Sequence, residues 1–426
     1  MTTKIHKTFF YLLLIQGGSY IVPLLFLPYL ARVLGVTEFG VLVFCQAVTQ
    51  YFLLLSDYGY NVTATRLISI HRDDPQALRG VYSSTTGARL ALVFISLVTA
   101  VIIVTSIPAL AKNWTIMAAA FIGVVGNAMT PVWLFQGLER MRSMVMPVLI
   151  SRLVSLAFVV ITVRGEGDAA LAALGISVGQ ISLALIMGWI VHRDRLVHLI
   201  AVPLSAVVRT LTDGFPVFLS LALLGCYSTL NTVVLNHIHG PNVVAQFAIA
   251  DKIRTAASAV FVLMGQAFYP RISQAYVKDR VAARHLMRTA TLAVVGIALA
   301  ICLAIQVLAG WGIDVWLGTK FHDAIYLLRL AAVLLPITAI GFAFSDLGLL
   351  VQGRTRAIKN IYLASTLLHI LYLVPLTAHF GAEGTIIALI LTESCNTLAF
   401  VVAFYRSIKP PSEAKPRIMP VSVPDE

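Results

Sequence analysis

Charged residues are scarce in this sequence, and acidic residues are the scarcer kind. Only 12% of the 426 residues are charged, against roughly 25% in a typical soluble domain. The 31 Lys and Arg residues outnumber the 19 Asp and Glu residues, which gives a formal net charge of +12. In a soluble protein this excess would suggest a nucleic-acid partner. Here the cations lie mainly in short loops between apolar runs, so we interpret the excess as a sign of membrane topology and expect no nucleic-acid partner.

Cysteine is also rare, and its placement argues against a disulfide framework or a zinc site. The four cysteines lie singly inside apolar runs, without the paired spacing that either site would need. They are Cys45, Cys226, Cys302 and Cys395, and we predict that they pack in the interior. His237 and His239 lie close together in the sequence but lack a third ligand. We therefore expect no metal and no other cofactor.

Long hydrophobic runs, by contrast, are abundant. A membrane-spanning helix needs about 20 mainly apolar residues. Runs of this kind occur at 9–31, 38–58, 83–107, 114–136, 144–163, 169–191, 214–236, 243–268, 287–308, 324–350, 358–378 and 384–405. The sequence therefore predicts an all-α polytopic membrane protein with twelve transmembrane helices.

The loop charges predict an orientation. Most Lys and Arg residues fall in loops on the side that also carries both termini, whereas the opposite side has only Arg32, Lys112, Arg164 and Lys320. Cytoplasmic loops of membrane proteins carry an excess of Lys and Arg, so both termini are predicted to be cytoplasmic.

The chain is also predicted to consist of two similar halves. The fourth span ends in Gln136-Gly137 and the tenth in Gln352-Gly353, and a glycine, Gly35 or Gly240, precedes the second span of each half. Transporters are often built from such repeats, with the substrate held between the halves. We predict pseudo-symmetric six-helix bundles at 1–200 and 201–408 around a central cavity, followed by a disordered cytoplasmic tail at 409–426.

Five cations lie inside the apolar runs, and they are the strongest indication of function. A charge on a helix deep in the bilayer costs at least about 2.5–3.5 kcal/mol, so such residues usually face a water-filled path or a partner. A chain that tolerates several, mostly positive, is expected to transport something negatively charged. The five are Arg89, Arg152, Lys252, Arg254 and Arg329.

Four segments resemble a known family. They are LPYLARVLG at 27–35 followed by Phe39-Gly40, WLFQGLERM at 133–141, FAIADKI at 247–253 and FYPRIS at 268–273. They are similar to the polysaccharide-transporter branch of the multidrug/oligosaccharidyl-lipid/polysaccharide exporter superfamily, which comprises the O-antigen flippases. The resemblance extends over essentially the whole chain.

This resemblance implies a flippase of the bacterial inner membrane. Such proteins move an undecaprenyl-diphosphate-linked oligosaccharide, an O-antigen or similar repeat unit, from the cytoplasmic to the periplasmic leaflet by alternating access between two bundles. Membrane lipids surround such a protein, and a polysaccharide polymerase and a chain-length regulator are candidate partners. Twelve spans fit this branch better than the fourteen usual in peptidoglycan-precursor flippases.

Two other functions stay open. A cation-coupled drug or metabolite antiporter of the same superfamily would be expected to have an acidic cavity for cationic cargo. A membrane polysaccharide polymerase or glycosyltransferase would need a sizeable extracytoplasmic domain or an acidic pair. The longest predicted outer loop covers only 309–323, so we expect a transporter and not an enzyme.

For a lipid-diphosphate cargo, the intramembrane cations are the candidate substrate-binding residues, because Arg matches the phosphate geometry with its planar donor fork. Asp251 and Arg254 are three residues apart and share a helix face. Arg254 and Lys252 are predicted to bind the diphosphate, with Asp251 restraining one of them or exchanging a proton. The alternative is a self-neutralised structural pair.

The other three cations lie at different depths. Arg152 comes eight residues into its span, about 12 Å by helical rise, and is predicted to face the cavity. Arg89 and Arg329 lie nearer the span ends and have two interpretations: they bind substrate, or they extend to the membrane interface.

Polar residues in the spans are the remaining candidates. Glu393 or Asp346 could carry a coupling proton, or each could make an ordinary hydrogen bond between helices. Asn231 is a candidate sugar-binding residue, and interhelical hydrogen bonding is the alternative. The same two interpretations apply to Gln46, Thr49, Gln50, Tyr227 and Ser228.

Overall fold

The computed structural model describes the backbone of residues 2–408 and, within that range, all side chains except those of 2–25, 220, 223, 224, 226–228, 262 and 408. The predicted disordered tail at 409–426 and the side chains of Cys226, Tyr227 and Ser228 lie outside the described residues.

Every regular element of the described backbone is helical. The helices are α1 (Thr2–Asp57), α2 (Tyr60–Ile70), α3 (Pro75–Ser106), α4 (Pro108–Ala111), α5 (Trp114–Met129), α6 (Val132–Gly137), α7 (Arg142–Thr162), α8 (Ala169–Arg193), α9 (Leu204–His239), α10 (Pro241–Lys278), α11 (Arg280–Trp316), the 3₁₀ helix η1 (Thr319–Phe321), α12 (Asp323–Ala332), α13 (Leu334–Phe344), the π-helix η2 (Ser345–Leu349) and α14 (Thr355–Ile408).

Each predicted span coincides with a helical segment. Two of the long helices, α1 and α14, contain two predicted spans each, joined at Gly35 and Gly381, where the backbone leaves the helical conformation. Eight helical stretches of the described residues are long and apolar enough to cross a membrane. Large apolar side chains on the outer surface, such as Phe94, Leu303 and Leu371, are exposed and suited to contact lipid. The prediction of an all-α, multi-pass membrane protein is confirmed.

The same glycine conformation occurs at corresponding places in the two halves. Gly35 has φ +70° and ψ 176°, and Gly240, between α9 and α10, has φ +80° and ψ −179°. Positive φ favours glycine, because a β-carbon would be strained there. Each glycine lies between the two predicted spans that it joins.

Aspartates at two loops fix where the following helices begin. The side chain of Asp74 accepts hydrogen bonds from the backbone amides of Gln76 and Ala77 at 2.9 and 3.1 Å, directly before Pro75 at the first position of α3. Asp279 caps α11 in the same way. These side chains satisfy amides that have no partner inside the helix, so both acids are explained by capping.

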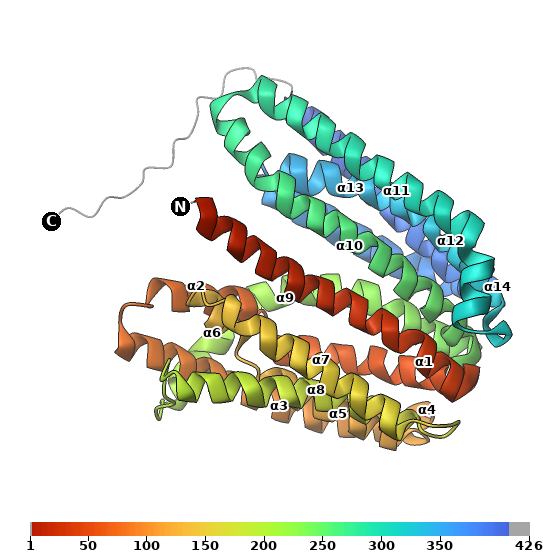
Figure 1. Ribbon diagram of the computed structural model, residues 1–426, viewed down its shortest axis with the longest axis horizontal. Helices are drawn as coiled ribbons and strands as arrows, with labels where there is room; N and C mark the ends of the chain where they lie inside the picture. The colour runs from red at the N-terminus through yellow and green to blue at the C-terminus, as the bar shows by residue number, and fades with distance from the viewer. Residues whose placement is uncertain (1, 409–426) are drawn as a thin grey trace.

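The helices form two lobes that converge at one end and diverge at the other (Figure 1). We call α1–α8 the N-lobe and α9–α14 the C-lobe. At the converging end, Thr37 donates to Asn242 Oδ1 at 2.7 Å, and Lys320 lies 3.7 Å from Glu166. Phe39 and Phe321 pack edge to face in the same region. These contacts from both lobes close this end of the molecule.

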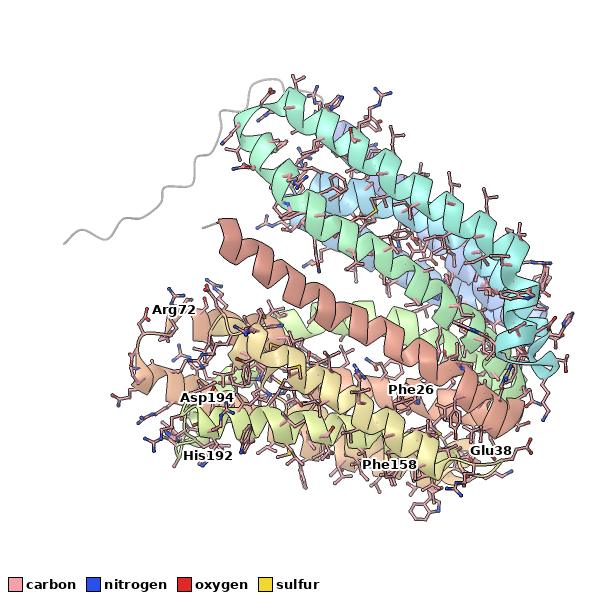
Figure 2. The ribbon with its side chains drawn as sticks, viewed as in Figure 1. Phe26, Glu38, Arg72, Phe158, His192 and Asp194 are labelled. Carbon is pink, nitrogen blue, oxygen red and sulfur yellow. The ribbon has the colours of Figure 1, made fainter. Side chains whose placement is uncertain are left out.

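Both described chain ends, residue 2 and residue 408, lie at the diverging end (Figure 1). The labelled side chains mark the two ends: Glu38 lies at the converging end, and Arg72, His192 and Asp194 lie at the other (Figure 2). At that end Arg140 lies 3.6 Å from Asp194, and Arg72 lies 3.6 Å from Glu139. Both ion pairs join residues of the N-lobe, whereas the contacts between the lobes described above lie at the converging end.

Candidate functional site

A cavity with two compartments lies between the lobes. The N-lobe compartment, of about 290 Å³, is lined by residues of α1, α5, α7 and α8 together with Lys252 of α10. The C-lobe compartment, of about 500 Å³, is lined by residues of α9, α10, α13 and α14 together with the second arm of α1. Gln46, Gln50 and Lys252 line both compartments, so these residues form the boundary between them.

Arg152 of α7 is the N-lobe's own cation in the cavity. Its side chain is half-buried and lines the N-lobe compartment beside Ser155 and Gln180. It makes no hydrogen bond and no ion pair within 4 Å to any residue that the structure describes. A cation that has no partner among the described residues of an apolar lobe is available to an anionic ligand.

Lys252 of α10 is the second cation that lines the N-lobe compartment. Its side chain is exposed to the cavity and lines both compartments. Among the described residues it has no ion pair within 4 Å, although Asp251 precedes it in the chain. Arg152 and Lys252 thus reach one compartment from opposite lobes.

Arg254 is held differently. Its guanidinium contacts Asp251 Oδ1 through Nη2 at 2.6 Å and through Nε at 3.1 Å. Nη2 also donates to Thr255 Oγ1 at 3.2 Å. Both charged groups line the C-lobe compartment. The predicted pairing on one helix face is present, and it offsets the charge of Arg254 within the cavity wall.

A buried polar cluster supports the wall of the C-lobe compartment. His369 of α14 is fully buried, with Nε2 2.9 Å from Asn231 Oδ1 and Nδ1 2.8 Å from Thr392 Oγ1. The Tyr372 hydroxyl also contacts Thr392. Asn231 lines the compartment, and so does Glu393, the neighbour of Thr392. The cluster fixes the Asn231 amide and the segment that carries Glu393.

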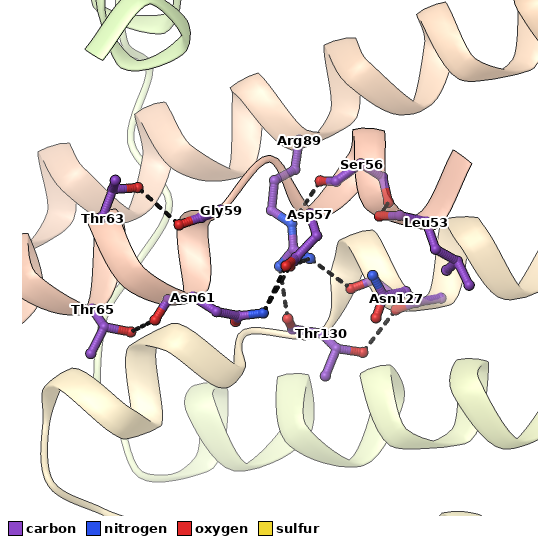
Figure 3. Close-up of polar contacts among 11 residues, drawn as sticks. Leu53, Ser56, Asp57, Gly59, Asn61, Thr63, Thr65, Arg89, Asn127 and Thr130 are labelled. Atoms are coloured by element: carbon purple, nitrogen blue, oxygen red, sulfur yellow. Dashed lines mark hydrogen bonds and ion pairs between the residues drawn. The ribbon is translucent and has the colours of Figure 1, made fainter. Parts of the chain in front are cut away.

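Arg89 lies outside the cavity, in a buried network within the N-lobe (Figure 3). Only 2% of its surface is exposed. Its guanidinium donates to the backbone oxygens of Thr130 at 3.0 Å and Asn127 at 3.1 Å, and Nη2 lies 3.3 Å from Asp57 Oδ1. These contacts tie α1, α3 and α5 together, so the geometry favours a structural role over substrate binding.

Two more predicted residues lie away from the cavity lining. Arg329 of α12 is exposed, and its backbone oxygen accepts a bond from Gln306 of α11 at 2.8 Å. Asp346 lies in the π-helix η2, where its carboxylate accepts a bond from the neighbouring Ser345 hydroxyl. Neither residue lines either compartment.

The polar residues predicted from the second and seventh spans do line the cavity where their side chains are described. Gln46, Thr49, Gln50 and Asn231 are among the lining residues. Gln180 was not predicted, although an amide inside the apolar run of α8 was a signal for it. Thr229 and Thr232 gave no such signal, because threonine is common in membrane helices.

Comparisons with known proteins identify the family. A family model described as "Polysaccharide biosynthesis protein" matches residues 5–276, more than half of the chain. The chain belongs to this family. A second model, MatE, matches residues 216–374.

Relatives from two bacteria match nearly the full length. A protein described as "Putative O-antigen transporter" from Escherichia coli (strain K12) is 29% identical over 406 residues, 95% of this chain and 98% of the relative. A protein of the same description from Shigella dysenteriae is 29% identical over 394 residues, 91% of this chain and 96% of the relative. The similarity to polysaccharide transporters seen in the sequence segments is confirmed.

The fold is shared with solved structures. A structure described as "Lipid II flippase MurJ, inward closed conformation" aligns with a TM-score of 0.74 at 12% identity, covering 95% of this chain and 87% of that chain. At this identity the match shows the fold alone.

Proposed function

We propose that this polysaccharide biosynthesis family member is a flippase for a polyprenyl-diphosphate-linked oligosaccharide. The observation that carries the proposal is the pair Arg152 and Lys252, which line the N-lobe compartment from opposite lobes, neither with an ion pair within 4 Å to a described residue. A diphosphate that bridges a lipid and a sugar has two negative charges. Two cations in a partly desolvated cavity offset these charges and bind through charge-assisted hydrogen bonds.

The shape of the cavity supports transport between leaflets. The proposed cargo enters from the diverging end, which the loop charges predict to be cytoplasmic, and leaves when the converging end opens to the periplasm. The undecaprenyl tail stays in lipid, and rocking of the predicted bundles at 1–200 and 201–408 changes the access. No bond is made or broken in this cycle.

The cavity charges favour this cargo over a cationic drug. The described residues that line the N-lobe compartment include two cations and no acid. Asp251 in the C-lobe compartment is already engaged by Arg254. A drug or metabolite antiporter for cationic cargo would place acids where this chain has Arg152 and Lys252.

A leaflet-resolved transport assay tests the proposal. The purified protein is reconstituted into lipid vesicles with undecaprenyl-diphosphate-linked N-acetylglucosamine, and a galactosyltransferase outside the vesicles labels only the sugar in the outer leaflet. Wild-type protein should make the inner-leaflet pool accessible. Arg152→Ala and Lys252→Ala should each lower the rate about tenfold or more, because each removes a hydrogen-bonded charge from the diphosphate.

Arg329→Ala is the matched control, because Arg329 is an exposed membrane cation outside the cavity lining. Its rate should equal that of the wild type. Wild-type rates for both cavity variants would refute the site, and protein-free rates for the wild type would refute the function.

A further inference from the structure

We propose that the C-lobe compartment holds the sugar part of the cargo and selects a neutral or amino-bearing sugar over an acidic one. This inference rests on the proposed function, because it assigns the headgroup of the same cargo. It starts from the unequal distribution of charge between the two compartments.

The two compartments differ in formal charge. Arg152 and Lys252 are the charged residues among those lining the N-lobe compartment, which is therefore positive. Apart from the shared Lys252, the charged residues lining the C-lobe compartment are Asp251, Arg254 and Glu393. Arg254 and Asp251 form an ion pair at 2.6 Å, and Glu393 is a second acid in this lining, so the C-lobe compartment has a lower formal charge than the N-lobe compartment.

Binding of the diphosphate increases this difference. Its two charges are offset by Arg152 and Lys252, which removes Lys252 as a partner for any other anion. A sugar carboxylate in the C-lobe compartment would then face Glu393 and Asp251, with the single cation Arg254 already paired. Like charges in a cavity of reduced dielectric repel strongly, so an acidic sugar is disfavoured.

The uncharged lining suits sugar hydroxyls. Gln46, Gln50, Asn231, Thr229 and Thr232 present amide and hydroxyl groups that can both donate and accept hydrogen bonds. An ionised Glu393 accepts strong hydrogen bonds from hydroxyl or ammonium groups. The contact between Asn231 Oδ1 and buried His369 holds one of these groups in place. The compartment therefore combines acceptors for an amino or hydroxyl sugar with repulsion of a carboxylate.

Binding measurements with four short-chain probes test this selectivity. The probes are citronellyl diphosphate alone and the same lipid linked to N-acetylglucosamine, glucosamine or glucuronic acid. Each is titrated into the detergent-solubilised protein at fixed ionic strength. We expect the wild type to bind the N-acetylglucosamine and glucosamine probes at least about tenfold more tightly than the glucuronic acid probe.

Two variants test whether the charges of the C-lobe compartment cause this selectivity. Glu393→Gln should bring the affinities for neutral and acidic probes to within about threefold of each other, because it removes the charge and keeps the shape. Thr232→Lys adds a cation to the same compartment and should raise affinity for the acidic probe, which provides an independent test if Glu393→Gln folds poorly. Asp346→Asn is the matched control, an acid outside the lining, and should keep the wild-type ratio.

The outcomes separate the two proposals. Equal wild-type affinity for neutral and acidic probes, or an unchanged ratio in both well-folded variants, overturns the selectivity while leaving the flippase in place. Failure of the wild type to bind citronellyl diphosphate or any linked sugar overturns both.

Discussion

Gly40 of α1 lies against the backbone of Pro241, the first residue of α10. A β-carbon at Gly40 would be 1.9 Å from the Pro241 carbonyl oxygen and 2.6 Å from its carbonyl carbon. Neither atom can move aside like a flexible side chain. The converging end therefore closes only because residue 40 is glycine, and the second arm of α1 meets the C-lobe through backbone contact.

Gly40→Ala should consequently open the converging end. Overpacking at this contact costs about 1–3 kcal/mol against the closed arrangement and should change the ratio of closed to open molecules about tenfold. Access to the cavity can be measured with the Gln46→Cys variant of a chain whose native cysteines are replaced, because residue 46 lines the cavity. Labelling by a membrane-impermeant maleimide added from outside the cell should rise in the Gly40→Ala background.

Gly188→Ala is the control for this experiment. A β-carbon on Gly188 of α8 would have no atom within 4 Å, so labelling should stay at the level of the unmodified protein. Equal labelling in the Gly40 and Gly188 variants would show that the Gly40 contact does not govern closure.

Arg89→Ala should destabilise the protein without acting on the cavity. Removing the guanidinium takes the ion-pair partner from the Asp57 carboxylate and a donor from the Thr130 and Asn127 carbonyls. Asn61 still donates to Asp57, and the Thr130 amide still donates to the Asn127 carbonyl. Breaking a buried ion pair in this way costs about 3–5 kcal/mol. Thermal unfolding of the detergent-solubilised protein should shift to clearly lower temperature.

The comparison for Arg89 is Arg152→Ala. Arg152 has no protein partner among the described residues, so its loss should leave the unfolding temperature close to that of the wild type while lowering transport. If Arg89→Ala unfolds like the wild type and loses only transport, the structural assignment of Arg89 fails.

These two arginines show what hydropathy can and cannot predict. The spans were predictable because each needs about 20 apolar residues, a local property of the sequence. The Asp251–Arg254 pair was predictable because residues three apart are neighbours on a helix. Depth in a span was equally readable for Arg89 and Arg152. The direction in which each side chain points could not be predicted, because the partners of Arg89 lie 32 to 41 residues away in sequence, on other helices.

Contacts between residues that are farther apart in the sequence could not be predicted. His369 and Asn231 are 138 residues apart and meet only because α9 packs against α14. Nothing near His369 in the sequence indicates this pairing. The close approach of Gly40 to Pro241 is similar, since it depends on how the two lobes meet and not on either segment alone.

Asp251→Asn should strengthen binding of a diphosphate headgroup. Asparagine keeps the side-chain shape but removes the carboxylate that holds Arg254 at 2.6 Å. The net formal charge of the cavity lining then rises by one. We expect citronellyl diphosphate to bind several-fold more tightly at low ionic strength, with the gain shrinking as added salt screens the charge.

Asp346→Asn, which removes an acid outside the cavity lining, should give wild-type affinity at every salt concentration. Weaker binding by Asp251→Asn would mean that Asp251 positions Arg254 for the ligand and does not compete with it.

His369→Leu should disturb the sugar compartment more than the diphosphate site. The substitution leaves Asn231 Oδ1 and Thr392 Oγ1 without the ring nitrogens that they contact at 2.9 and 2.8 Å. Each lost hydrogen bond costs about 0.5–1.5 kcal/mol, so the unfolding temperature should fall. Thr392 keeps its contacts with the Tyr372 hydroxyl and the Ala388 carbonyl. Because Asn231 lines the C-lobe compartment and Arg152 does not, affinity for the N-acetylglucosamine probe should drop while affinity for citronellyl diphosphate alone stays within about twofold.

His369→Gln, which can reach one of the two partners, should fall between the leucine variant and the wild type. A parallel loss for both probes in the leucine variant would show that the cluster supports the whole cavity and not the C-lobe compartment alone.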